Sequence, residues 1–215
     1  MAYDFKKEMK ELYAPKARPE IVHVPAANFL AVRGKGDPNE AGGDYQHAVS
    51  VLYSVAYTIK MSYKTDRRIE GFFEYVVPPL EGFWEQQGGG MVDLSDKSSF
   101  GWISVIRLPD FVAQEDVEWA VREAGRKKKM DCSACEMITV DEGLCVQMMH
   151  TGPYDSEPET VAAMDAFLEE NGYENDIGVR RHHEIYISDP NKTAPEKRKT
   201  IIRHPIKARL RDAQK

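Results

Sequence analysis

The sequence has few cysteines, no long apolar run and no strong excess of one charge. Three cysteines in 215 residues, an odd number, do not make the disulfide framework typical of small secreted proteins. No apolar stretch approaches the ~20 residues that span a bilayer, and the N-terminus lacks the apolar core of a secretory signal. A net charge of −6 argues against nucleic acid as a partner. We therefore expect a cytoplasmic protein whose partners include neither membranes nor nucleic acid.

Several common catalytic and metal-binding motifs are absent or incomplete. Cys132 and Cys135 form a C-x-x-C pair, but no second pair and no H-x3-H motif completes the four ligands of a structural zinc site. The segment 34–36 lacks the spacing of a phosphate-binding loop and favours a turn. No Gly-x-Ser-x-Gly nucleophile motif occurs. His182 and His183 follow two arginines, and we interpret them as the solvated, basic start of a strand; we expect no metal and no cofactor.

The composition is that of an ordinary globular protein, and the two halves of the chain are alike. Hydrophobic residues make up 42% and charged residues 30%, which is typical of a domain with an adequate core. Each half offers a strand, a turn leading into a helix, and two further strands. These segments are residues 29–49, 71–79 and 102–110 in the first half and 144–164, 182–190 and 200–207 in the second. We predict an α+β fold made by tandem duplication of a strand-helix-strand-strand module with pseudo-twofold symmetry.

Three helices are predicted from periodicity and end signals. In the first, residues 44–62, apolar side chains recur at steps of three and four. The second begins at a capping box formed by Ser156 and Glu159 and ends at Gly172. The third, residues 113–129, has acids in its first turn and bases in its last, as the helix dipole favours. If helices cover one face of each module, the opposite faces can meet, and we expect a central ligand cleft between them.

One predicted strand carries a glutamate beside aromatic residues. In RRHHEIYISDP, residues 180–190, alternation places Glu184 and Tyr186 on one side and the isoleucines on the other. A carboxylate in a cleft is costly unless it has a partner, so it would hold a cationic ligand or accept a proton from water. Alternation by itself favours the other interpretation, in which the glutamate faces solvent.

The predicted strand at 71–79 carries a second glutamate, Glu74. Around the two acids, the candidate ligand contacts are aromatic and methionine side chains, which suit flat apolar ligands. Together with Glu74, the candidates are Tyr75, Trp84, Trp102, Met148 and Met149.

Long stretches of the chain resemble one known family. The strings CVQMMHTGPYDSEPETVAAMDAFLEENGY, HHEIYISDPNKTAPEKRKTIIRHPIK, PPLEGFW and VIRLPDFV are similar to the GyrI-like small-molecule-binding family, and to its stand-alone branch rather than its transcription-factor branch. The resemblance implies one GyrI-like domain at 21–207, with modules at about 21–130 and 131–207, a leader at 1–20 and a tail at 208–215. The leader is too short for a helix-turn-helix, so we do not expect transcriptional regulation by this chain.

The resemblance also implies a function. Family members bind bulky, often aromatic or cationic compounds in a central cleft, and the glutamate of the HxEIY strand, here Glu184, is the acid that faces the ligand. The stand-alone branch resembles cyclopropanoid cyclopropyl hydrolases, which detoxify DNA-alkylating natural products by opening a strained cyclopropane with water.

This chemistry suggests roles for particular residues of the chain. We hypothesise that Glu184 holds and deprotonates the water, and that Tyr186 or another hydroxyl donates to the ligand carbonyl. Trp84, Trp102 and Tyr75 would position the ligand. The alternative is a multidrug-binding protein that sequesters or senses ligands without chemistry. A monomer suffices for either function, because the two modules already make a two-sided cleft.

Overall fold

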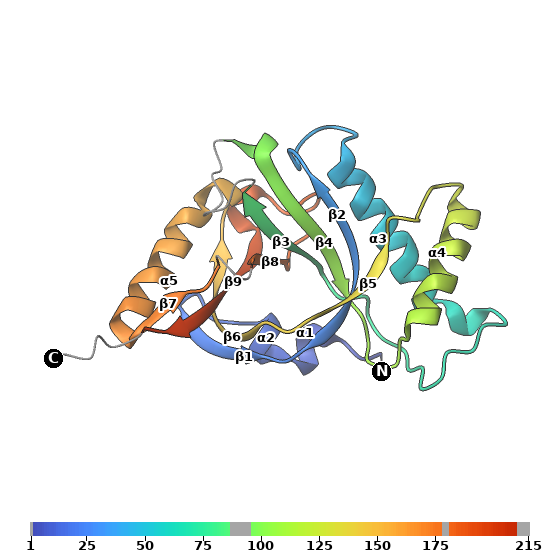
Figure 1. Cartoon of the computed structure of the whole chain (residues 1–215), viewed down its shortest axis with the longest axis horizontal. Helices are drawn as coiled ribbons and strands as arrows, with labels where there is room; N and C mark the ends of the chain where they lie inside the picture. The colour runs from blue at the N-terminus through green and yellow to red at the C-terminus, as the bar shows by residue number, and fades with distance from the viewer. Residues whose placement is uncertain (1, 87–95, 178–180, 210–215) are drawn as a thin grey trace.

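The architecture is one large antiparallel sheet with helices packed on it (Figure 1). The computed structural model describes residues 2–86, 96–177 and 181–209. Within these residues the strands are β1 (Glu20–Val24), β2 (Ala27–Lys35), β3 (Leu80–Gln86), β4 (Phe100–Arg107), β5 (Glu136–Val140), β6 (Gly143–Thr151), β7 (Tyr173–Asn175), β8 (His182–Tyr186) and β9 (Lys199–Ala208). The α-helices are α1 (Phe5–Glu8), α2 (Lys10–Tyr13), α3 (Asp44–Lys60), α4 (Gln114–Lys128) and α5 (Glu157–Asn171). The predicted α+β class is confirmed.

The strand order places the two halves of the chain side by side in one sheet. The order is β1-β6-β9-β8-β3-β4-β2-β5, with β7 pairing with β9 outside this path. Each half therefore contributes a strand, a helix and two strands, as β2-α3-β3-β4 and β6-α5-β8-β9. The halves join where β3 pairs with β8, so the edge strand of each half satisfies the backbone of the other. They do not form two separate sheets that face each other.

The predicted strand at 71–79 is wrong. That segment is irregular apart from a single bridge between Tyr3 and Tyr75. The strand that pairs with β4 and β8 is β3, which begins only at Leu80. Pro78 and Pro79 explain the shift, because proline has no N–H to donate to a sheet ladder.

The three predicted helices form close to their expected bounds. α3 and α5 lie at opposite ends of the same face of the sheet, and α4 packs against α3 on the outside (Figure 1). α5 ends at Gly172, whose positive φ of 76° is the left-handed cap that glycine adopts without strain. The predicted capping box does not form, because the Ser156 hydroxyl donates to the Pro153 carbonyl instead of accepting from the helix.

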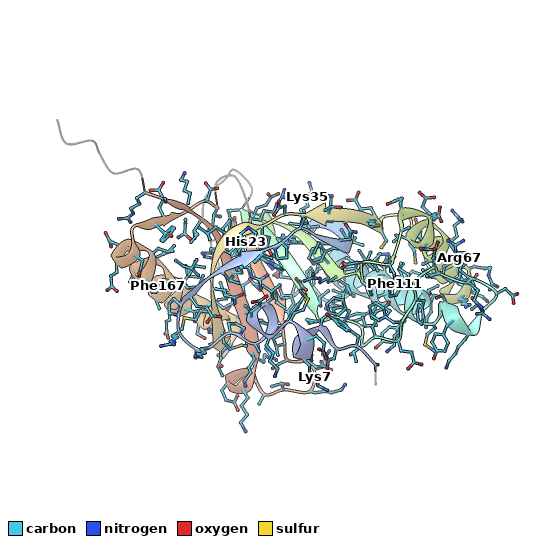
Figure 2. The ribbon with its side chains drawn as sticks, turned by 90° about the horizontal axis from the view of Figure 1, so that it is seen from below. Lys7, His23, Lys35, Arg67, Phe111 and Phe167 are labelled. Atoms are coloured by element: carbon cyan, nitrogen blue, oxygen red, sulfur yellow. The ribbon has the colours of Figure 1, made fainter. Side chains whose placement is uncertain are left out.

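Residues 2–20, most of the predicted leader, pack against the sheet. α1 and α2 lie across the middle of the sheet on the face opposite α3 and α5, between the ends marked by Phe167 and Arg67 (Figure 2). Phe5, Leu12 and Tyr13 are buried there. Most of the predicted tail at 208–215 lies outside the described residues. No helix in the described ranges has both the length and the apolar character that crossing a bilayer requires.

The face under α1 and α2 contains a network of buried charges, which we call the interior network: Tyr13, Glu81, Glu142, His183 and Arg203. His183 is fully buried, and its two ring nitrogens lie 2.9 Å from carboxylate oxygens of Glu81 and Glu142. Tyr13 donates to Glu81 at 2.9 Å, and Arg203 donates to Glu142 at 3.1 Å. Two cations and two carboxylates thus balance each other where water is excluded.

The pKa values of His183 and Glu142 favour the charged forms of both groups. Burial lowers the pKa of His183, but the charges and hydrogen bonds of Glu142 and Glu81 outweigh burial and raise it to about 9. Burial raises the pKa of Glu142, but His183 and Arg203 outweigh it and bring that pKa down to about 2. His183 is therefore an imidazolium ion that donates from both nitrogens.

We predict that His183→Gln lowers the free energy of unfolding by about 3–5 kcal/mol at pH 6, because it removes the cation that the buried carboxylates of Glu81 and Glu142 share. In the wild type, this free energy should fall as the pH rises from 6.5 to about 9, because the folded protein keeps a proton that the unfolded chain releases. Urea denaturation across this range measures both effects. His23→Gln, at an exposed histidine of β1, is the control, and an unchanged slope in His183→Gln would contradict the assignment.

Candidate functional site

Glu184 lies near the middle of the sheet, on the face that carries α3 and α5. Its neighbours across the strands are Gly82 of β3 and Ile202 of β9. Its side chain is only 14% exposed, so the carboxylate does not point into bulk solvent. A carboxylate with so little water around it depends on partners within the protein.

The imidazoles of His182 and His204 form a chain of polar contacts that ends at Glu184. His182 Nε2 lies 3.0 Å from Glu184 Oε1, and His182 Nδ1 lies 2.7 Å from His204 Nε2. Burial, reinforced by His182, holds the pKa of His204 well below its usual value, so His204 is neutral. A chain in which His204 donates to His182 and His182 donates to Glu184 satisfies both contacts. It leaves His204 Nδ1 as a buried atom without a hydrogen-bond partner in the described structure.

The interpretation of His182 and His183 as a solvated basic patch is wrong. His182 is 9% exposed and His183 is fully buried. β8 lies at the centre of the sheet, and helices pack over both of its faces, α1 and α2 on one and α3 and α5 on the other. Each histidine therefore has a carboxylate partner on its own face of the sheet.

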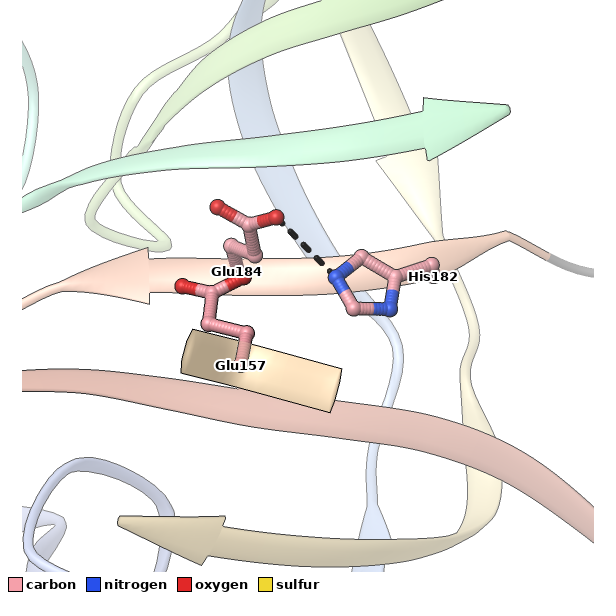
Figure 3. A group of neighbouring side chains, drawn as sticks. All are labelled: Glu157, His182 and Glu184. Carbon is pink, nitrogen blue, oxygen red and sulfur yellow. Dashed lines mark hydrogen bonds and ion pairs between the residues drawn. The ribbon is translucent and has the colours of Figure 1, made fainter. Parts of the chain in front are cut away.

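Glu157, the first residue of α5, completes this group. Glu157, His182 and Glu184 each offer one nitrogen or oxygen atom that could bind a metal ion, and these three atoms lie within 4.8 Å of one another (Figure 3). Glu157 is 5% exposed, and its Oε1 has no hydrogen-bond partner among the described residues. Burial raises the pKa of Glu157 well above its usual value, and the charge of Glu184 raises it further. We call these three residues the carboxyl–imidazole cluster.

Aromatic side chains surround the cluster. Trp84 Nε1 donates to the Tyr186 hydroxyl at 3.0 Å. The Tyr45 ring centroid lies 5.5 Å from that of Trp84 and 5.2 Å from that of Trp102, and Tyr154 meets Tyr186 edge-on at 6.0 Å. Burial raises the pKa of Tyr45, of Tyr154 and of Tyr186, so all three hydroxyls remain protonated donors at neutral pH.

The structure brings together four of the residues singled out from the sequence: Glu184, Tyr186, Trp84 and Trp102. Met148 shares their face of the sheet, where it packs in the apolar cluster under α5.

Three other candidates lie elsewhere. Tyr75 and Met149 pack on the opposite face of the sheet, with Phe5 and Ile201. Glu74 is exposed on the irregular segment before β3, because the strand that was expected to carry it begins after the two prolines. These three residues do not contact the carboxyl–imidazole cluster.

Sequence reasoning missed Glu157, His204, Tyr45 and Tyr154. Glu157 lies in the first turn of α5, where an acidic residue is ordinarily explained by the helix dipole. Nothing in the spacing along the chain links it to β8, since the contact depends on where α5 starts above the sheet. Alternation along the strand puts His182 on the same side as Glu184, and this is the signal in the sequence for their contact.

The cluster also has donor atoms that a cation could use. One imidazole and two carboxylates suit a divalent transition ion, and His204 behind His182 resembles the outer partner that ligating histidines use. Structural zinc sites, however, have four protein ligands. The cluster supplies three, and the His182–Glu184 hydrogen bond already pairs two of them.

Other features contribute less to a site. Cys132 and Cys135 are buried and free, and burial raises the pKa of Cys135 to about 12, so it is an unreactive thiol. A concavity of about 310 Å³ lies on the face opposite Glu184. Its lining includes the apolar side chains of Phe83 and Ile103 and the basic side chains of Arg33 and Arg181.

Comparisons with known proteins support a small-molecule site. The profile described as GyrI-like small molecule binding domain matches residues 17–207. A solved structure of an uncharacterized conserved protein from Listeria innocua is 52% identical, with a TM-score of 0.90, and covers 95% of this chain and 100% of that one. A hydrolase from Listeria innocua is 50% identical, with a TM-score of 0.87 and the same coverage. The EcmrR C-terminal domain, 13% identical over 89% of this chain and 98% of that one, has a TM-score of 0.55 and shows a shared fold alone. No curated protein sequence matches the chain.

Gly82 has no side chain and therefore leaves space for the hydrogen bond between Trp84 and Tyr186. A Cβ at position 82 would lie 2.7 Å from Trp84 Nε1 and 3.2 Å from the Tyr186 hydroxyl. We expect Gly82→Ala to separate the two side chains, alter tryptophan fluorescence, and lower the free energy of unfolding by about 1–3 kcal/mol. Gly101→Ala is the matched control, since its Cβ would meet only the flexible side chain of Glu85, at 3.0 Å. Equal fluorescence changes in both variants would disprove the crowding argument.

Proposed function

This chain belongs to the GyrI-like small molecule binding domain family, and on that premise we propose that it binds bulky aromatic or cationic xenobiotics and hydrolyses cyclopropane-bearing DNA-alkylating compounds. The observation that carries the proposal is the Glu184 carboxylate, nearly buried beside the hydrogen-bonded pair Trp84 and Tyr186. We call the aromatic side chains around Glu184 the aromatic wall: Tyr45, Trp84, Trp102, Tyr154 and Tyr186. A carboxylate beside such a wall can hold a flat ligand and activate a water molecule that attacks it. The 50% identity to a protein described as a hydrolase supports chemistry in addition to binding.

The proposed ligand site is a central cleft between α3 and α5, above the β3–β8 pair. Both halves of the chain supply side chains to this region: Tyr45 and Trp84 from the first, Tyr154 and Tyr186 from the second. This two-sided contribution is what a duplicated module with pseudo-twofold symmetry would give, and we include the duplication in the proposal. One chain is then sufficient, and we place the activity in the cytoplasm as a detoxifying function.

Glu184 is the base in the proposed reaction. A water held by its carboxylate attacks the cyclopropane methylene, and one water proton passes to Glu184 as the C–O bond forms. The strained C–C bond breaks, and its electron pair moves through the conjugated ring to the carbonyl oxygen, which becomes a phenolate. Glu184 then releases its proton to solvent and the phenolate takes one up. The net reaction adds one water to the ligand.

Neighbouring side chains support these steps without reacting. His182 donates to Glu184 and holds its carboxylate in place. Tyr186 stays protonated because burial and Glu184 raise its pKa, so its hydroxyl can donate to the ligand carbonyl as negative charge develops there. Trp84 and Trp102 provide flat surfaces that hold the ligand close to the water.

The alternative function is sequestration or sensing of ligands without turnover. The same buried acid and aromatic wall would bind an aromatic cation through charge and stacking. Product analysis separates the two functions. Incubation of a cyclopropane-bearing alkylator with substoichiometric protein, followed by mass spectrometry, should show the mass of one added water in an amount exceeding the protein. Retention of unchanged compound at one equivalent would instead indicate a binder.

We predict that Glu184→Gln lowers kcat by about 10²- to 10⁴-fold, because the amide cannot accept the proton of the water. The ligand should still bind, since the aromatic wall is intact, and fluorescence titration measures this. Glu74→Gln is the matched control at an exposed glutamate and should leave kcat unchanged. Full activity in Glu184→Gln would exclude Glu184 as the base.

A further inference from the structure

The two carboxyl groups of the carboxyl–imidazole cluster have unequal surroundings. Glu184 has an imidazole partner, His182 Nε2, at 3.0 Å. Glu157 is 5% exposed and no Lys, Arg or His within the described ranges forms an ion pair with it. Its Oε1 is a buried oxygen without a hydrogen-bond partner in the same part of the chain. The two side chains nevertheless place oxygens within 4.8 Å of each other (Figure 3).

Two carboxylates this close, with little water between them, cannot both be ionised at low cost. The proton belongs on the group that lacks a hydrogen-bond donor to its charged form. That group is Glu157, because His182 donates to Glu184 and stabilises its negative charge. From this geometry we infer that Glu157 and Glu184 form a carboxyl pair that holds a single proton, with Glu157 the acid and Glu184 the base.

Other charged and titratable groups around the pair do not change this assignment. Asp155 is a further negative charge that raises the pKa of Glu157, after burial and Glu184. Arg198 lies over the Tyr154 ring, 5.6 Å from its centroid. Lys97 pairs with Asp155 at 3.0 Å. The other titratable groups near the pair, within the described part of the chain, are His182, His204, Tyr45, Tyr154 and Tyr186, of which the tyrosines stay neutral.

The pair adds a second carboxyl to the proposed hydrolysis, and this role depends on the proposed function. Before attack, Glu157 carries the one proton and can donate a hydrogen bond to the water or to Glu184. During attack, Glu184 accepts a proton from the water, so the pair then holds two protons. Release of one proton to solvent restores the starting state. Glu157 keeps its own proton throughout and is therefore a positioning residue for the base.

The first test needs no ligand. Infrared difference spectroscopy at neutral pH, comparing the wild type with Glu157→Gln, should show the carbonyl stretch of a protonated carboxylic acid in the wild type alone. Glu74→Gln, at an exposed carboxylate, should leave that band in place. Glu184→Gln should shift the loss of the band to lower pH, because it removes the neighbouring negative charge. A wild-type spectrum with no such band at neutral pH, or a band retained in Glu157→Gln, would overturn the inference.

The second test uses the dependence of stability on pH. Because burial and Glu184 raise the pKa of Glu157, the folded state is penalised as the pH rises above the ordinary glutamate value of 4.5. Glu157→Gln mimics the protonated acid, so its urea midpoint should match the wild type at pH 4.5 and exceed it increasingly at higher pH. A midpoint below the wild type that falls further behind as the pH rises would show that Glu157 is needed as an anion.

The third test measures turnover, and it distinguishes failure of the carboxyl pair from failure of the proposed hydrolysis. The kcat/KM profile of the wild type should fall at high pH as Glu157 ionises, and Glu157→Gln should lose that alkaline limb. An alkaline limb retained in Glu157→Gln would overturn the positioning role. If the infrared band behaves as expected but no hydrated product forms, the proposed hydrolysis fails and the carboxyl pair stands.

Discussion

The edge-to-edge pairing of β3 with β8 is the contact on which the rest of the structure depends. It joins the two halves of the chain into one sheet, and its register, Gly82 opposite Glu184 and Phe83 opposite His183, fixes what each face carries. Because side chains alternate along a strand, one register decision sends Glu184 toward α3 and α5 and His183 toward α1 and α2. A slip by one residue would exchange the two sets.

The pairing also separates two buried polar groups of opposite character. In the interior network, two cations meet two carboxylates and nearly every polar atom has a partner, so the network serves to fix α2, β3, β8 and β9 relative to one another. On the other face, the carboxyl–imidazole cluster has more acid than base and keeps buried atoms without partners. Unsatisfied polar groups are costly to a fold, and their concentration beside the aromatic side chains supports the site proposed there.

Glycine and aromatic residues cooperate in building that wall. Trp102 lies directly over Gly34, where a Cβ would come within 2.2 Å of its ring, and the Trp84–Tyr186 hydrogen bond lies over Gly82. Flat rings can approach the sheet only where the strand beneath has no side chain. The positions of the large rings are therefore fixed by the backbone beneath them.

Much of this could be predicted from the sequence. Periodicity gave the three long helices, and alternation placed Glu184 and Tyr186 on one side of their strand, because both signals are local and repeat with the geometry of the backbone. The strings that resemble the family led to the proposal that Glu184 is the acid facing the ligand. Proline chemistry could have corrected the bounds of β3, since Pro78 and Pro79 are plain in the sequence.

Only the tertiary structure decided which groups meet. The contact of Glu157 with Glu184 joins a helix start to a strand 27 residues later, and that of His182 with His204 joins two strands across a turn. The burial of His183 between Glu81 and Glu142 depends on the pairing of β3 with β8 and on the turn between β5 and β6 that carries Glu142. The sequence determined the local conformation and the types of side chain; the packing of distant segments, which no local period encodes, determined the distances between charges and hence their protonation.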